Sequence, residues 1–118
     1  MQEPEVRLRR LSINDTRYLD AVLRTDADDG IEHQLDPHVR SLIALGILVA
    51  LDGPPSSFEW ATSLALANGA TAEELVEVLI AAAPLVGSAH VVAAAPRLAC
   101  ALGFDLDADL ERLETGLS

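Results

Sequence analysis

The chain has 118 residues, of which half are apolar and only 3% are aromatic, and its formal net charge at pH 7 is −11. This length suits one domain with its own hydrophobic core, and apolar residues that are mainly Ala, Leu and Val favour packed helices over a β-sandwich. The negative charge argues against nucleic acid or an anionic membrane as a partner, because both bind cationic surfaces.

The cysteine content and the N-terminal segment indicate the cellular compartment in which the protein works. The single cysteine, Cys100, excludes a disulfide or a two-cysteine redox centre within one chain. No apolar run reaches the length of about 18 residues that a membrane span needs. The segment MQEPEVRLRR is charged rather than signal-like, and all eight basic residues are arginine, as expected for a GC-rich genome. We therefore expect a cytoplasmic protein of bacterial type.

In chain order, the first helical pattern covers residues 14–24. It opens with the capping residues Asn14 and Asp15 and continues with apolar residues at helical spacing. An acidic, glycine-containing loop follows at residues 26–34. Residues 1–34 are thus expected to form an N-terminal arm and helix.

The second helix is predicted over residues 37–51. Asp36 is its expected N-cap and Pro37 its first helical residue, a position where the missing N–H costs nothing. The run SLIALGILVAL is apolar on every side, which is typical of a helix that is buried all round. We expect this helix at the centre of a bundle or in a subunit interface.

The stretch GPPSSFEWA connects this helix to the next one. Its glycine and two prolines end the preceding helix, and Ser56 or Ser57 can cap a new helix that reaches about Asn68. Gly69 then provides the C-terminal glycine at which helices often end.

Two further helices follow. Thr71 and Glu74 form a capping box at the start of a helix that is expected to end near Pro84. An alanine-rich helix covers residues 88–102, and we expect it to kink or break at Pro96.

The C-terminal segment at residues 104–116 is predicted to be a short acidic amphipathic helix. No strand pattern and no internal repeat is found. The sequence therefore predicts an all-α, single-domain bundle of about six helices over residues 1–118.

Two ordered runs carry a family resemblance: LDPHVRSLIALGILVAL, and then SFEWATSLALANGATAEELVEVLIAAAPLVGSAHVVAA. Together they resemble the carboxymuconolactone decarboxylase family, which includes the alkyl hydroperoxidase D group, over about residues 35–95. The resemblance implies an alkyl hydroperoxidase D-like helical fold assembled as a homo-oligomer, a trimer or hexamer. Such an assembly would explain an apolar helix without a polar face.

The resemblance fails at the reactive positions. The redox branch of the family uses Cys-x-x-Cys, a histidine and a glutamate in the preceding helix, and these positions fall on Pro54, Ser57, Ala61 and Ser41. Thiol-based peroxide reduction needs a thiolate and a resolving thiol, which this stretch lacks. The non-redox branch keeps the histidine, which is Ala61 here. Neither mechanism of the family carries over intact.

Glu59 and His90 are the candidate acid–base residues. A carboxylate beside aromatic side chains can act as an acid or base when its pKa is raised, although Glu59 also suits the first turn of a helix. His90 lies on the alanine-rich helix that lines the pocket region in this family. It can replace the missing histidine or simply bond to a backbone carbonyl at an interface.

Phe58, Trp60, Ser57 and Arg40 are the candidate ligand-binding residues. Aromatic residues at helical spacing more often serve packing, and Ser57 more often serves as a cap. Arg40 can bind a carboxylate of the substrate or pair with Asp36 four residues away.

No metal site or cofactor is expected. Glu32, His33, Asp36 and His38 match no usual ligand spacing, and His38 is expected to face solvent or a neighbouring subunit.

Two functions therefore stay open. The chain is either a catalytically degenerate oligomer that binds a small organic acid or apolar ligand, or a non-redox lyase that acts on a small organic acid or ring compound through Glu59 and His90. An enzyme should bring these two residues together in an open pocket. A scaffold should fill that volume with Phe58, Trp60 and leucines.

Overall fold

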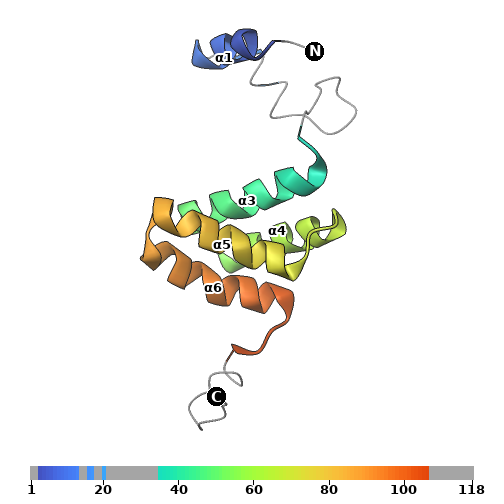
Figure 1. Cartoon of the computed structure of the whole chain (residues 1–118), viewed down its shortest axis with the longest axis vertical. Helices are drawn as coiled ribbons and strands as arrows, with labels where there is room; N and C mark the ends of the chain where they lie inside the picture. Colours follow the sequence, from blue (N-terminus) through green and yellow to red (C-terminus); the bar gives the residue numbers. More distant parts are fainter. Residues whose placement is uncertain (1–2, 14–15, 18–19, 21–34, 107–118) are drawn as a thin grey trace. The chain divides into compact units, whose positions relative to one another are not determined.

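A computed structural model of the chain describes residues 3–13, 16–17, 20 and 35–106 (Figure 1). It divides into two units, residues 1–34 and 35–118, which are described separately. Most of the predicted helix at 14–24, the loop at 26–34 and most of the predicted C-terminal helix at 104–116 lie outside the described residues.

The first unit contains a helix that the sequence patterns did not predict, α1 (Pro4–Ser12). Its proline lies at the start of the helix, where the missing N–H is tolerated. An ion pair joins Arg9 Nη2 to Glu5 Oε1 at 3.0 Å, one turn apart. None of its residues is buried.

Helix α3 (Pro37–Leu51) begins as predicted, because the backbone N–H of His38 donates to Asp36 Oδ1 at 2.9 Å. Helix α4 (Pro55–Ala67) begins earlier than predicted. Pro54 is its N-cap residue, so the expectation that Ser56 or Ser57 caps it was wrong. Both serines lie in the first turn, since Pro55 already has the backbone angle of a first helical residue.

Helix α5 (Ala72–Val86) carries the predicted capping box, and α6 (Ser88–Leu102) follows after Gly87. Helix α5 ends at Val86, near Pro84 as predicted, although Pro84 itself lies inside the helix. Helix α6 continues through Pro96, so the alternative of a break there was wrong, and the alternative of a kink stays a prediction. Proline frees the carbonyl four residues earlier. These carbonyls belong to Ile80 and Val92, two residues at exposed positions of their helices.

Helices α3, α4, α5 and α6 form a bundle in which α4 and α5 each pack against both α3 and α6 (Figure 1). Its core consists of small and medium side chains: Leu45, Val49, Phe58, Ala65, Ala70, Leu75, Leu79, Ala94 and Leu98. The all-α prediction is confirmed, since no strand occurs among the described residues. These residues form five helices rather than about six, and none of the five is long and apolar enough to cross a membrane.

Arg97 on α6 contacts the turn between α3 and α4. Arg97 Nη1 lies 2.7 Å from Asp52 Oδ1 and donates to the carbonyl oxygen of Gly53 at 2.8 Å. Asp52 has left-handed backbone angles, with φ at 55°, which are costly for a residue with a Cβ atom. The charge contact thus stabilises a strained turn directly before α4.

Within the described residues 35–106, the outer face of α3 is not covered by another helix. Val39, Ile43, Ile47 and Leu51 follow one another at four-residue spacing and are 40–73% exposed. We call these four residues the α3 row. Within residues 35–106 the packing of α4 and α5 leaves this face open, so the helix does not lie at the centre of the bundle. Its burial in a subunit interface stays a prediction.

Candidate functional site

The GPPSSFEWA stretch forms the α3–α4 turn and the first turns of α4. Phe58 is fully buried in the core, whereas Trp60 is 62% exposed. Residues two apart on a helix point in different directions, so the two aromatic side chains do not form one wall. Trp60 is thus not a core residue, and whether either aromatic residue binds a ligand stays a prediction.

Two of the four positions at which the family resemblance would place reactive groups are buried. Ala61 is 1% exposed and Ser41 is 3% exposed. Ser41 Oγ donates to the carbonyl oxygen of His38 at 2.7 Å, a local bond within its own helix. Ser57 is half-buried and Pro54 is exposed. Cys100, the only thiol, is exposed on α6.

Glu59 is exposed on α4 and His90 is half-buried on α6. The two helices pack against each other. No hydrogen bond or ion pair joins Glu59 to His90 among the described residues. Their proposed acid–base roles therefore stay predictions.

Arg40 is exposed on the first turns of α3. The expected ion pair with Asp36 does not form between these two described residues. The Asp36 carboxylate instead accepts the N–H of His38, since it serves as the N-cap of α3. Arg40 as a binder of a carboxylate ligand stays a prediction.

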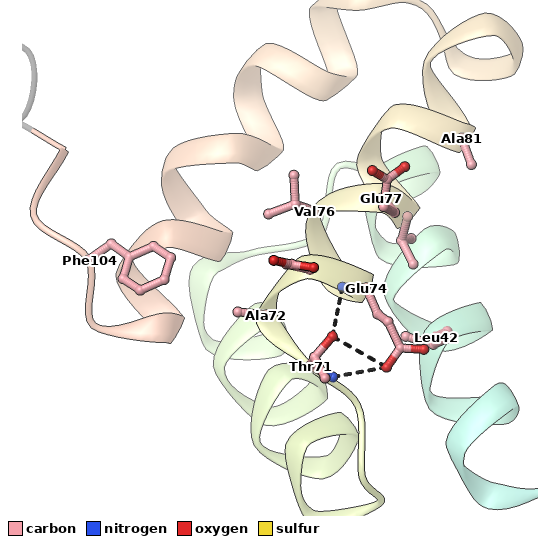
Figure 2. A pocket seen from close by; sticks show the side chains of 10 residues that line it. Leu42, Thr71, Ala72, Glu74, Val76, Glu77, Ala81 and Phe104 are labelled. Atoms are coloured by element: carbon pink, nitrogen blue, oxygen red, sulfur yellow. Dashed lines mark hydrogen bonds between the residues drawn. The ribbon is translucent and has the colours of Figure 1, made fainter.

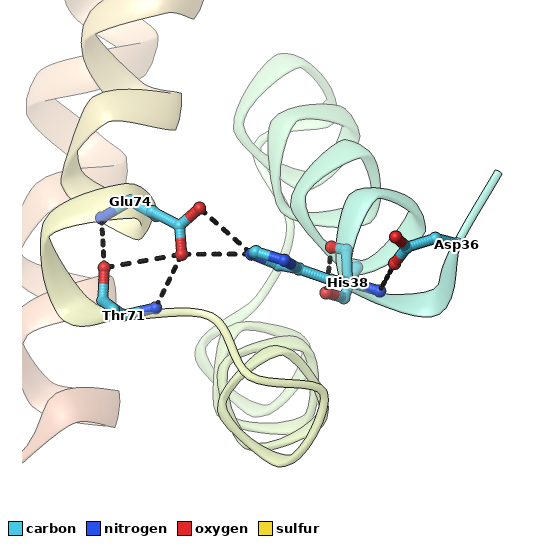
Figure 3. A network of polar contacts seen from close by, with 5 residues as sticks. Asp36, His38, Thr71 and Glu74 are labelled. Carbon is cyan, nitrogen blue, oxygen red and sulfur yellow. Dashed lines mark hydrogen bonds and ion pairs between the residues drawn. The ribbon is translucent and has the colours of Figure 1, made fainter.

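Figure 3 shows a polar network in which the predicted caps at Asp36 and Thr71 are joined by a contact that the sequence did not predict. His38 Nε2 lies 3.0 Å from each carboxylate oxygen of Glu74, so it joins the start of α3 to the start of α5. The prediction that His38 faces solvent or a neighbour was incomplete, because its side chain is 34% exposed and has this partner. A contact across 36 residues leaves no signal in local spacing.

Glu74 also completes the capping box of α5. The Thr71 N–H donates to Glu74 Oε1 at 3.0 Å, and the Glu74 N–H donates to Thr71 Oγ1 at 3.1 Å. The bond from the Thr71 backbone holds the pKa of the Glu74 carboxyl below its usual value, and His38 adds to this effect. Glu74 is therefore an ionised link between two helix starts.

A groove of about 690 Å³ lies beside this network, over the N-terminal half of α5 (Figure 2). Its walls come from α3, α5 and the residues after α6, and they are Leu42, Thr71, Ala72, Glu73, Glu74, Val76, Glu77, Val78, Ala81 and Phe104. This volume lies in the range of small-molecule sites, about 300–1,000 Å³. None of the candidate residues that the sequence suggested lines this groove. Among the described residues, no cluster of three groups that could hold a metal ion was found.

Comparisons with known proteins agree with the helical bundle. The model of the carboxymuconolactone decarboxylase family matches residues 16–99. The curated proteins and the solved structures that were searched give no significant match. Since the match extends over most of the 118 residues, the chain belongs to the carboxymuconolactone decarboxylase family.

Proposed function

We propose that this chain is a catalytically degenerate family member that binds a small molecule as a homo-oligomer and has no peroxidase or thiol-redox chemistry. The observation that carries this proposal is that none of the four positions expected to hold reactive groups, Pro54, Ser57, Ala61 and Ser41, carries one. Two of them are also buried: Ala61 and Ser41 are at most 3% exposed, and Ser41 replaces the expected glutamate with a locally bonded hydroxyl. A substrate cannot reach buried side chains without moving the core.

The thiol content supports the same proposal. Peroxide reduction through a dithiol requires two cysteines that can form a disulfide. The chain has only Cys100, which lies on α6 rather than at the start of α4. Two chains could pair through exposed thiols, but that arrangement would not reproduce a Cys-x-x-Cys motif on one helix turn.

The α3 row supports the homo-oligomer. Four large aliphatic side chains in one line on an acidic protein form the kind of exposed apolar surface that marks an interface. A second copy can cover this surface without bringing charges together, because the row contains none. We expect a trimer or a hexamer, as the family resemblance implies.

Light scattering coupled to gel filtration tests the assembly. The wild type should have the mass of a trimer or hexamer, and Ile43→Glu with Ile47→Glu should give smaller species, because the change buries charges at the interface. Val92→Glu, at an equally apolar exposed position on α6, is the matched control. A wild type that stays monomeric at high concentration contradicts the assembly.

The groove over α5 supports small-molecule binding. Apolar side chains form most of its walls, which favours an apolar ligand body. Its carboxylates disfavour the alternative ligand class, a small organic acid, by like-charge repulsion. A thermal-shift screen of small apolar compounds tests this part, and the absence of any ligand that raises Tm would count against it.

A non-redox lyase that uses Glu59 and His90 is the second candidate. One observation favours it: these residues lie on α4 and α6, which pack against each other. Turnover of a carboxylated lactone that disappears in both Glu59→Gln and His90→Gln would establish it. Turnover that survives both substitutions would refute the assigned roles.

A further inference from the structure

We propose that the groove over α5 binds an amphipathic organic cation, with the apolar body against the groove wall and the ammonium group between Glu73 and Glu77. This inference rests on the proposed function only in assuming that the chain binds a small molecule. It adds the charge of the ligand and the position of its charged group within that groove.

The apolar part of the groove is open to solvent. Phe104 is 52% exposed and Val76 is 44% exposed, and Leu42 and Val78 complete the wall. Figure 2 shows Phe104 on one side of the α5 start and Leu42 on the other. Covering such surface stabilises a complex by about 25 cal/mol for each Å² of apolar area removed from water. A ligand with an alkyl or ring body meets this requirement.

The charged part of the groove has one sign. All the ionisable side chains in its wall are glutamates: Glu73, Glu74 and Glu77. Glu74 is engaged by Thr71 and His38. The side-chain carboxylates of Glu73 and Glu77 have neither a hydrogen bond nor an ion pair with the described residues, so two carboxylates of the wall are available to a ligand.

Interactions with the start of helix α5 explain only part of the negative charge in the groove wall. Glu73 and Glu74 lie in the first turn of α5, where carboxylates favour the positive end of the helix dipole. Glu77 lies beyond that turn. It is four residues from Glu73, a spacing at which like charges repel by about 0.2–0.5 kcal/mol. A cation between them would remove the repulsion and gain two charge-assisted contacts.

Three six-carbon probes test the charge preference on the full chain: hexylammonium, hexanol and hexanoate. Titration of the ¹⁵N-labelled protein by NMR gives both the Kd and the amides that shift. We expect hexylammonium to bind about fivefold more tightly than hexanol. This factor corresponds to the upper end of the range for one exposed ion pair. Hexanoate should bind most weakly, and the shifts should centre on residues 71–78.

Substitutions distinguish the contribution of the charged wall to binding from that of the apolar wall. Glu73→Gln with Glu77→Gln should remove the preference for the amine and leave hexanol binding unchanged. Glu3→Gln with Glu5→Gln makes the same change in net charge in the other unit and should leave the preference intact. Phe104→Ser should weaken the binding of hexylammonium and the binding of hexanol by a similar factor.

The outcomes distinguish the two proposals. Hexanol binding without any preference for the amine overturns the cation and leaves small-molecule binding standing. An amine preference that survives the glutamine substitutions places the cation elsewhere and overturns the site. Binding of none of the probes at α5, with this face protected by a second copy, overturns the groove as a ligand site.

Discussion

Substitution of Arg97 tests how the turn before α4 is held. Arg97→Met keeps much of the aliphatic stem but removes the guanidinium group from Asp52 Oδ1 at 2.7 Å and from the Gly53 carbonyl oxygen at 2.8 Å. The side chains of Arg97 and Asp52 are 29% and 55% exposed. Solvent therefore limits the ion pair to about 1 kcal/mol at most.

The bond to the Gly53 carbonyl oxygen adds about 1 kcal/mol, a typical net value for an intramolecular hydrogen bond. Together the two contacts predict a loss of about 2 kcal/mol in the free energy of unfolding. For a chain of this size the loss corresponds to a drop in Tm of roughly 8 °C. Circular dichroism during thermal and urea unfolding measures both quantities.

Two variants of Asp52 divide this effect. Asp52→Asn should lose only the ion pair, about 1 kcal/mol, since asparagine tolerates left-handed backbone angles. Asp52→Gly should be close to neutral, because removal of the Cβ atom relieves about 1 kcal/mol of backbone strain at φ 55°. The double variant that combines Asp52→Asn with Arg97→Met gives the coupling energy between the two side chains.

Arg40→Met is the matched control, because the side chain of this exposed arginine has no ion pair or hydrogen bond with the described residues. It should change the stability by less than about 0.5 kcal/mol. If Arg97→Met costs no more than this control, the guanidinium contacts do not hold the turn.

Three further predictions concern the core and the capping box. Phe58→Ala should cost about 3–5 kcal/mol in urea unfolding, because the side chain is fully buried; a cost below 1 kcal/mol would place the side chain outside the core. Thr62→Val should raise Tm, since Thr62 Oγ1 is buried without a hydrogen-bond partner among the described residues; a lower Tm would indicate that the hydroxyl is bonded. Glu74→Gln should destabilise the chain at neutral pH but not in acid. The folded pKa of Glu74 lies below its unfolded value, so the stability it gives is complete above the ordinary glutamate pKa of about 4.3 and is lost as the pH falls through the folded pKa. A difference between wild type and variant that does not shrink in acid would contradict this linkage.

Local signals in the sequence were sufficient for most of the helix boundaries. Asp36 and Thr71 cap the helices that follow them, because a cap needs only residues within one turn. The serines at 56 and 57 misled the prediction because both cap-like residues follow Pro55, which already starts the helix. The prolines within α5 and α6 follow the exposed residues Ile80 and Val92 by four positions, and spacing alone does not reveal this exposure.

The candidate site was less predictable, because it depends on contacts between distant helices. The His38–Glu74 pair and the Arg97–Asp52 pair join residues 36 and 45 positions apart. The groove likewise combines Leu42, residues 71–81 and Phe104. A capping glutamate near an apolar stripe was visible in the sequence, but the side chains that complete the groove became apparent only from the packing of α3 and α5.

Hydroperoxide consumption with a dithiol reductant tests most directly whether this family fold has lost thiol-redox chemistry. The assay compares the purified wild type with Cys100→Ser, which removes the only thiol. Both proteins should consume hydroperoxide at the background rate of the reductant alone. Catalytic turnover by the wild type that disappears in Cys100→Ser would contradict the proposed loss of redox function.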